Sequence, residues 1–368
     1  MNQHPSSAEQ TEREERREFA ALQWFAVVVT LIVVISALVI GRQIGEDVQN
    51  DAPPLHPARM ATNAADAAAP AAGAATTASA SAGSSGAAPQ PGAQAASSPG
   101  PVKKTAFAPP AADQIPEGPM GDVIRQGEQI FLHTGANAKG FVGNTLNCVN
   151  CHLDAGRLAN SAPLWGAYLS YPAYRSKTKS VSTFSERLRG CFMYSMNGKA
   201  PPDGHEVLVA LETYSYWMAQ GTTVGEKLPG SGYAKLPKPE KAADYARGKA
   251  VYEAQCALCH GANGEGQRSG DVQVFPPLWG AQSYNWGAGM ADLHNAAGFV
   301  KANMPLSRGN TLSDQQAWDV AQFIDSQERP QDPRFTGDVA STRKQFHDTE
   351  NSLYGTMVNG KLLGQGIR

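Results

Sequence analysis

Two copies of the pattern Cys-x-x-Cys-His occupy residues 148–152 and 256–260. This spacing is the attachment site of a c-type haem, in which two thiols bond the porphyrin and the adjoining histidine binds the iron. A zinc site would need four protein ligands around one ion, and a redox Cys-x-x-Cys would need no histidine. The repeat therefore predicts two covalently bound haems c. Their thiols and iron ligands would be Cys148, Cys151 and His152, then Cys256, Cys259 and His260.

The second haem needs a sixth ligand or an open position on its iron. Met304 follows Trp279 by 25 residues and precedes Pro305. A methionine before proline on a distal loop suits iron ligation, so we predict His260/Met304 ligation. His294 is the alternative ligand.

The same distance applied to the first copy leads to a cysteine. Cys191, the fifth cysteine of the chain, follows Trp165 by 26 residues. We therefore predict a Cys191 thiolate as the sixth ligand, which would lower the potential of this haem relative to a thioether ligand. One alternative is that Cys191 is a buried structural thiol, and another is that it lies near a haem whose iron is bound by Met193 or Met196.

Residues 183–198 predict a helix around this cysteine. Thr183 and Glu186 form a capping-box pattern at its start, and Gly198 is a plausible end. Arg187, Cys191 and Ser195 then share one face, at positions i, i+4 and i+8. That face would present a cation, a sulfur and a hydroxyl to the haem.

Positive charge dominates between Pro172 and Pro201. One acidic residue, Glu186, stands against six basic ones: Arg175, Lys177, Lys179, Arg187, Arg189 and Lys199. Basic residues that line a cleft attract and hold anions. For Lys177 and Lys179 we expect an ordinary solvent-exposed surface.

The elements around the two motifs repeat in the same order. Each copy has a helix before the motif, a Pro-Leu-Trp-Gly-Ala segment after it, and an apolar-periodic closing helix, near residues 205–220 and 314–327. This order predicts an all-α fold with two tandem cytochrome c-like domains.

The N-terminal third has a different composition. Phe19–Gly41 has no charged residue, and a helix of this length spans roughly 34 Å, enough for a membrane. We predict a retained single-pass anchor in the inner membrane, a flexible Ala/Pro/Ser-rich tether and haem domains in the periplasm. A cleaved signal is the alternative.

The expected organisation follows the whole chain. Its segments are a cytoplasmic segment (1–18), the anchor (19–41), the tether (42–115), the first cytochrome domain (116–225), a connector (226–241), the second cytochrome domain (242–331) and a C-terminal extension (332–368). A formal net charge of −2 gives no sign of nucleic-acid binding.

From Pro119 onward the chain resembles the dihaem thiosulfate dehydrogenases. The resemblance rests on both haem motifs, on residues 185–198 and on the late run from Tyr354 to Gly360. It implies His152/Cys191 ligation at the active-site haem and His260/Met304 at the electron-exit haem. It also implies substrate binding near Cys191 by Arg187 and Ser195, with Arg175 as a further candidate. The anchor and tether depart from many members, which are soluble periplasmic proteins.

The resemblance implies an enzyme that couples two thiosulfate ions to tetrathionate. The electrons would pass through two haems to a c-type cytochrome or another periplasmic acceptor, and tetrathionate reduction would use the same site. Cys191 would leave the iron and form a sulfur adduct with the first thiosulfate, which the second then attacks. The rival hypotheses are a membrane-tethered electron carrier without substrate chemistry and a cytochrome subunit of a larger respiratory complex.

Overall fold

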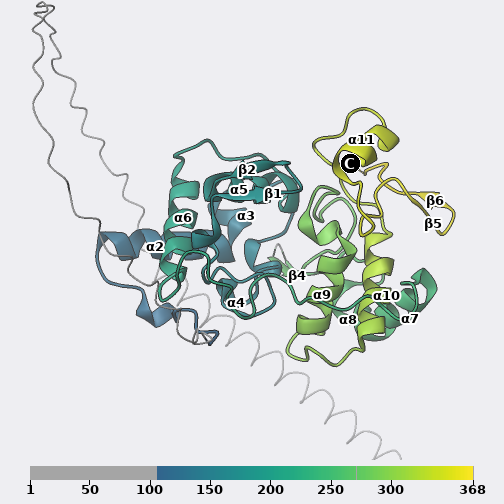
Figure 1. Ribbon diagram of the computed structural model, residues 1–368, viewed down its shortest axis with the longest axis horizontal. Helices are drawn as coiled ribbons and strands as arrows, with labels where there is room; N and C mark the ends of the chain where they lie inside the picture. The colour runs from purple at the N-terminus through teal and green to yellow at the C-terminus, as the bar shows by residue number, and fades with distance from the viewer. Residues whose placement is uncertain (1–105, 271, 368) are drawn as a thin grey trace, which may run out of the picture. The chain divides into compact units, whose positions relative to one another are not determined.

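The computed structural model describes residues 106–270 and 272–367, which lie within the compact unit Ala95–Arg368 (Figure 1). The predicted anchor and nearly all of the predicted tether lie outside these residues. Within the described ranges no helix combines the length and the apolar character that a membrane crossing requires.

The described residues form a predominantly helical fold. Its α-helices are α2 (Pro119–Leu132), α3 (Thr134–Asn137), α4 (Leu153–Gly156), α5 (Phe184–Gly190), α6 (Glu206–Met218), α7 (Tyr245–Gln255), α8 (Ala257–His260), α9 (Leu293–Asn303), α10 (Asp314–Asp325) and α11 (Val339–Phe346). A π-helical turn, η4 (Cys191–Ser195), directly follows α5.

Within residues 106–270 and 272–367, three antiparallel hairpins interrupt the helices, and the all-α prediction missed them. They pair β1 (Ala173–Arg175) with β2 (Ser180–Ser182), β3 (Gln267–Ser269) with β4 (Val272–Phe275), and β5 (Met357–Val358) with β6 (Lys361–Leu362). Strands of two to four residues are too short to show an alternating pattern in the sequence. The β1–β2 hairpin matters for the site, because Lys177 lies in its loop.

One glycine in each repeat lets two helices come close together. A Cβ atom on Gly127 of α2 would lie 2.1 Å from the carbonyl oxygen of Ala210 in α6. A Cβ atom on Gly248 of α7 would lie 1.9 Å from the carbonyl oxygen of Asp319 in α10. The helix before each haem motif therefore packs backbone to backbone on the closing helix, in the same way in both repeats.

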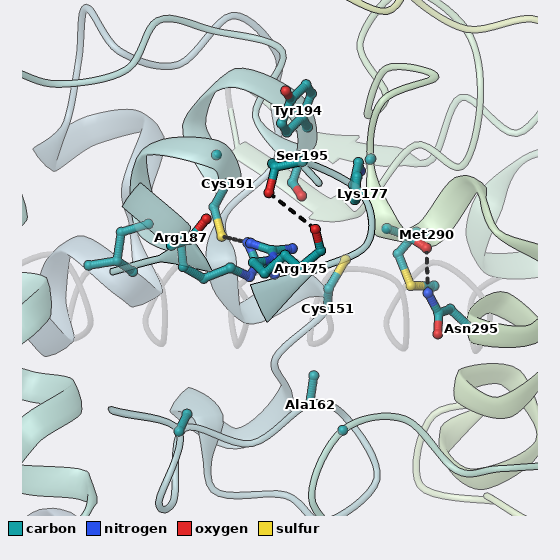
Figure 2. A pocket seen from close by; sticks show the side chains of 18 of the residues that line it. Cys151, Ala162, Arg175, Lys177, Arg187, Cys191, Tyr194, Ser195, Met290 and Asn295 are labelled. Atoms are coloured by element: carbon teal, nitrogen blue, oxygen red, sulfur yellow. Dashed lines mark hydrogen bonds between the residues drawn. The ribbon is translucent and has the colours of Figure 1, made fainter. Parts of the chain in front are cut away.

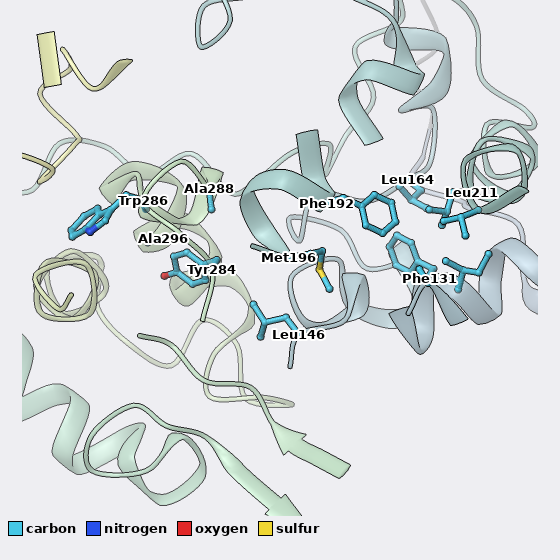
Figure 3. Close-up of a cluster of buried hydrophobic side chains, with 14 of the residues drawn as sticks. Phe131, Leu146, Leu164, Phe192, Met196, Leu211, Tyr284, Trp286, Ala288 and Ala296 are labelled. Carbon is cyan, nitrogen blue, oxygen red and sulfur yellow. The ribbon is translucent and has the colours of Figure 1, made fainter. Parts of the chain in front are cut away.

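The main hydrophobic core extends across both repeats. Phe131, Leu164 and Phe192 of the first repeat belong to the same buried cluster as Tyr284 and Trp286 of the second (Figure 3). A smaller cluster around Tyr252, Phe323 and Ile324 packs α7 against α10. The shared cluster fixes the first haem motif relative to residues of the second repeat.

Candidate functional site

A cavity of about 1440 Å³ lies at the first haem motif. The motif residues Cys148, Cys151 and His152 line it together with α5, η4 and the β1–β2 loop. Residues 344–349 of the C-terminal extension also line it. Figure 2 shows the labelled side chains Cys151, Arg187 and Cys191 around this space.

The first motif offers two unpaired thiols and a neutral histidine, which are the groups that hold a haem c. Cys148 and Cys151 are free thiols, and burial raises the pKa of each to about 12. Burial lowers the pKa of His152 to about 4, so its imidazole is neutral, the form that binds metal. The Nδ1 atom of His152 lies 2.6 Å from the Ala162 carbonyl oxygen. Since that carbonyl can only accept, Nδ1 carries the proton and Nε2 is left to bind iron.

A buried donor in the cavity wall also fits a haem. The indole Nε1 of Trp165 is buried and has no hydrogen-bond acceptor among the described residues. A buried donor without an acceptor is costly, so this wall is suited to a further polar group. The first motif and its cavity therefore fit a covalently attached haem c, held by Cys148, Cys151 and His152.

The second motif repeats part of this arrangement. The Nδ1 atom of His260 lies 2.9 Å from the Pro276 carbonyl oxygen, which again leaves Nε2 for iron. Burial raises the pKa of Cys256 to about 11. Met304 follows the last residue of α9 and packs with Cys256 and Trp279 against the smaller core cluster.

The other groups near Met304 are engaged elsewhere. The alternative ligand His294 stacks on Trp318, with ring centroids 5.8 Å apart. The Lys301 ammonium donates to the Leu312 carbonyl at 2.6 Å and pairs with Asp314 at 3.0 Å. These contacts favour Met304 as the predicted sixth ligand.

The helix that presents Cys191 starts where the sequence predicts. The Thr183 hydroxyl accepts from the Glu186 amide at 3.2 Å, and the Glu186 carboxylate accepts from the Thr183 amide at 2.7 Å. The predicted single α-helix is wrong beyond Gly190, because residues 191–195 form the π-helical turn η4. The Met196 amide donates to the Cys191 carbonyl at 3.0 Å, an i to i+5 bond. Such π turns are rare and concentrate at functional sites.

Two asparagine side chains outside this turn bind its backbone carbonyls. The Asn285 side chain donates to the Met193 carbonyl at 2.8 Å, and the Asn285 backbone amide donates to the Tyr194 carbonyl at 3.2 Å. The Asn144 side chain donates to the Ser195 carbonyl at 2.9 Å and to the Ser283 carbonyl at 3.1 Å. Contacts between residues 51 and 92 positions apart therefore satisfy carbonyls of the turn that a regular helix would have used.

Arg187 and Cys191 lie together in the cavity, as their spacing predicts. The Arg187 guanidinium donates to the Cys191 sulfur at 2.7 Å (Figure 2). Negative charge on that sulfur raises the pKa of Arg187. Ser195 and Arg175 line the same cavity, and burial and Arg187 lower the pKa of Arg175. All four candidate site residues therefore surround one space.

The two alternative methionine ligands occupy different surroundings. Met196 is only 2% exposed and belongs to the main hydrophobic core. Met193 is partly exposed and also lines the cavity. Neither methionine has the cationic partner that Arg187 provides to Cys191, so the structure favours the cysteine as the reactive sulfur.

Lys177 corrects one of the sequence-based expectations. It is not an ordinary surface lysine: it is only partly exposed, and it lines the cavity. Its ammonium donates to the Gly287 carbonyl and lies 4.7 Å from the centre of the Tyr194 ring. Lys179, two residues later, is exposed, as expected. No local sequence signal separates these two lysines, because the residues that cover Lys177 are distant in the chain.

The C-terminal extension supplies further residues that the sequence did not suggest. Arg334 donates to both carboxylate oxygens of Asp332, at 3.0 and 2.6 Å, and lies 5.0 Å from the Tyr194 ring centre. His347 lies 2.9 Å from the same carboxylate and lines the cavity. This buried network fixes the extension beside the site.

Comparison with known proteins found one family model and several relatives that match this chain. Residues 243–324 match the family model described as "Cytochrome C oxidase, cbb3-type, subunit III". The chain is 61% identical over 258 residues to a thiosulfate dehydrogenase of Thiomonas intermedia (strain K12), covering 70% of this chain and 82% of the relative. It is 50% identical over 264 residues to a thiosulfate dehydrogenase of Stutzerimonas stutzeri (strain A1501), covering 71% and 86%.

A solved structure agrees with these relatives. It is the as-isolated form of the thiosulfate dehydrogenase TsdBA from Marichromatium purpuratum. The TM-score is 0.68 and the sequence identity 47%, over 71% of this chain. The chain spans 58% of the length of that protein.

Proposed function

This chain belongs to the thiosulfate dehydrogenase family of c-type cytochromes, and on that premise we propose that it oxidises two thiosulfate ions to tetrathionate. One observation carries the proposal: the Arg187 guanidinium lies 2.7 Å from the Cys191 sulfur inside the cavity of a haem motif. A nucleophilic sulfur, a fixed cation and a redox centre are the parts that this reaction needs.

Electrostatics explains why the pocket is cationic. Two thiosulfate dianions 6 Å apart repel each other by about 11 kcal/mol at an effective dielectric constant of 20. Arg175, Lys177 and Arg187 line the cavity, and their positive charge offsets this repulsion. A carrier that exchanges only electrons would need no such cluster.

The chemistry balances with Cys191 as the nucleophile. The Cys191 thiolate and the outer sulfur of the first thiosulfate form an S–S bond, and two electrons leave the pair. The outer sulfur of the second thiosulfate then attacks the adduct sulfur that is bonded to the Cys191 sulfur. The bond to Cys191 breaks, tetrathionate forms, and the Cys191 thiolate is returned. Haem c, when bound, supplies the one-electron chemistry, and an external cytochrome or another periplasmic acceptor removes the electrons.

A thiosulfate titration of the haem-loaded full chain tests this proposal. Thiosulfate should reduce the haem of the purified protein, and with an added electron acceptor one tetrathionate should form per two thiosulfates consumed. Tetrathionate with a reductant should drive the reverse reaction through the same site. Reduction only when another enzyme is added would favour an electron carrier or a subunit of a larger complex.

We expect two covalent haems per chain, because both motifs place a histidine Nδ1 against a backbone carbonyl. A pyridine haemochrome assay, referred to protein concentration, measures this number. Replacing Cys256 and Cys259 with alanine should reduce the count by one and leave the first haem attached. A wild-type count of one would contradict the prediction.

The absorbance spectrum of the haem-loaded protein tests the ligation of the second haem. Oxidised wild type should show the long-wavelength charge-transfer band of methionine bound to iron, and Met304→Ala should remove it. No lysine exchange is expected on reduction, since Lys301 is already held by Leu312 and Asp314. A band that appears only after a reduction cycle would mean that exchange occurs.

We further propose that Phe19–Gly41 anchors the protein in the inner membrane, with the haem domains in the periplasm. The composition of residues 19–41 supports this location. Fractionated cells should contain the chain in the membrane pellet, and proteolysis within residues 42–115 should release active protein. A soluble mature chain that begins near residue 42 would show a cleaved signal instead.

A further inference from the structure

Lys177 lies at a wall that two cavities share. The large cavity at the first haem motif and a smaller one of about 320 Å³ are both lined by Lys177, Tyr194 and Phe346. Figure 2 shows Lys177 and Tyr194 with Ser195 and Cys191 in the lining of one pocket. Lys177 therefore lines the same cavity as Cys191 and is open to an anion bound there.

The positive charge of Lys177 has no acidic partner. No carboxylate in the described part of the chain lies within ion-pair distance of its ammonium, which contacts the Gly287 carbonyl and the Tyr194 ring. Two of the other nearby cations are engaged, Arg187 by the Cys191 sulfur and Arg334 by Asp332. A partly buried ammonium with neutral partners is suited to a bound anion.

Lys177 also differs from the other lysines of the cavity. Five lysines line the large cavity, and only Lys177 is not exposed. The exposed ones are Lys179, Lys227, Lys235 and Lys344. Water screens an exposed lysine, so the interaction of Lys177 with an anion is stronger. Burial, Arg334 and Arg187 lower the pKa of Lys177 to about 7, and a bound dianion would favour its charged form.

The fold holds this lysine in a fixed place relative to Cys191. Tyr194 lies three residues after Cys191 in η4, and its ring lies against the Lys177 ammonium. A Cβ atom on Gly287 would lie 2.5 Å from the Tyr194 ring, so a glycine is needed there. Gly287 thus admits the ring and supplies the carbonyl that Lys177 binds, which makes Tyr194 and Gly287 positioning residues.

We propose that Lys177 binds the sulfonate group of the second thiosulfate, while Arg187 and Cys191 hold the first. This inference rests on the proposed function. The reason is that two dianions need two separate cationic positions, and the described cavity offers a second one at Lys177. Lys177 therefore determines how the attacking thiosulfate is held, and not how the first one reacts with Cys191.

Lys177→Met tests the proposal, because methionine keeps an unbranched chain and removes the charge. In the haem-loaded full chain, the half-saturating thiosulfate concentration should rise about tenfold, equal to about 1.4 kcal/mol. Lys177→Arg should restore it to within threefold. Mass spectrometry of the Cys191 peptide should show that the first thiosulfate adduct still forms, and that its release by added thiosulfate is slower.

The matched control is Lys199→Met, which removes an exposed charge outside both cavities and should change the half-saturating concentration less than twofold. If Lys177→Met does not take up haem, Lys177→Gln replaces it in the comparison. An unchanged half-saturating concentration, or equal loss in Lys177→Met and Lys177→Arg, would overturn the inference. Wild type that does not oxidise thiosulfate would instead overturn the proposed function.

Discussion

Cys191→Ala is expected to lower thiosulfate oxidation by at least about 10³-fold, since removal of a nucleophile removes the covalent step altogether. Haem attachment should persist, because the thiols that bond the first haem are Cys148 and Cys151. The measurements are acceptor-dependent thiosulfate consumption and the covalent haem count on the same preparation. The oxidised variant should also lack the paramagnetic-resonance signal of a thiolate-bound low-spin haem.

Met193→Leu is the matched control for this variant. Met193 lies two residues after Cys191 and lines the same cavity, and it is the alternative sulfur ligand that is not in the core. Its replacement should leave activity and the thiolate signal within about twofold of wild type. Near-normal turnover in Cys191→Ala, or loss of the signal in Met193→Leu, would contradict the assignment of Cys191.

Arg187→Ala should lower kcat/KM for thiosulfate by roughly 10²-fold, the effect of removing one donor that stabilises charge in a closed site. Arg187 contacts the Cys191 sulfur at 2.7 Å and is the cation nearest to the first thiosulfate in the proposed arrangement. Without it the sulfur lacks its counterion and the first dianion lacks its main attraction. Steady-state kinetics over a range of thiosulfate concentrations measures the change.

Two further variants make this result specific. Arg187→Lys keeps the charge but loses the planar group, and it should recover part of the lost activity. Arg125→Ala removes an arginine that pairs with Asp122 and Glu117 at the surface, and it should change kcat/KM less than twofold. Equal kcat/KM in Arg187→Ala and wild type would contradict the role of Arg187 in binding thiosulfate.

Local sequence patterns predicted much of the candidate site. The haem motifs, the Thr183–Glu186 capping box and the i to i+4 spacing of Arg187 and Cys191 each depend on residues close in the chain. Backbone geometry alone brings such residues together once the helix forms. The closing helices likewise followed from apolar periodicity, which α6 and α10 bear out.

Only the tertiary structure decided the π-helical turn and the role of Lys177. The turn at Cys191 depends on Asn285, and the environment of Lys177 depends on Gly287 and Arg334. These partners lie 88 or more positions away in the sequence, and no short pattern encodes their approach. A lysine becomes a binding group or a solvated surface charge according to what covers it, and burial is a property of the folded chain.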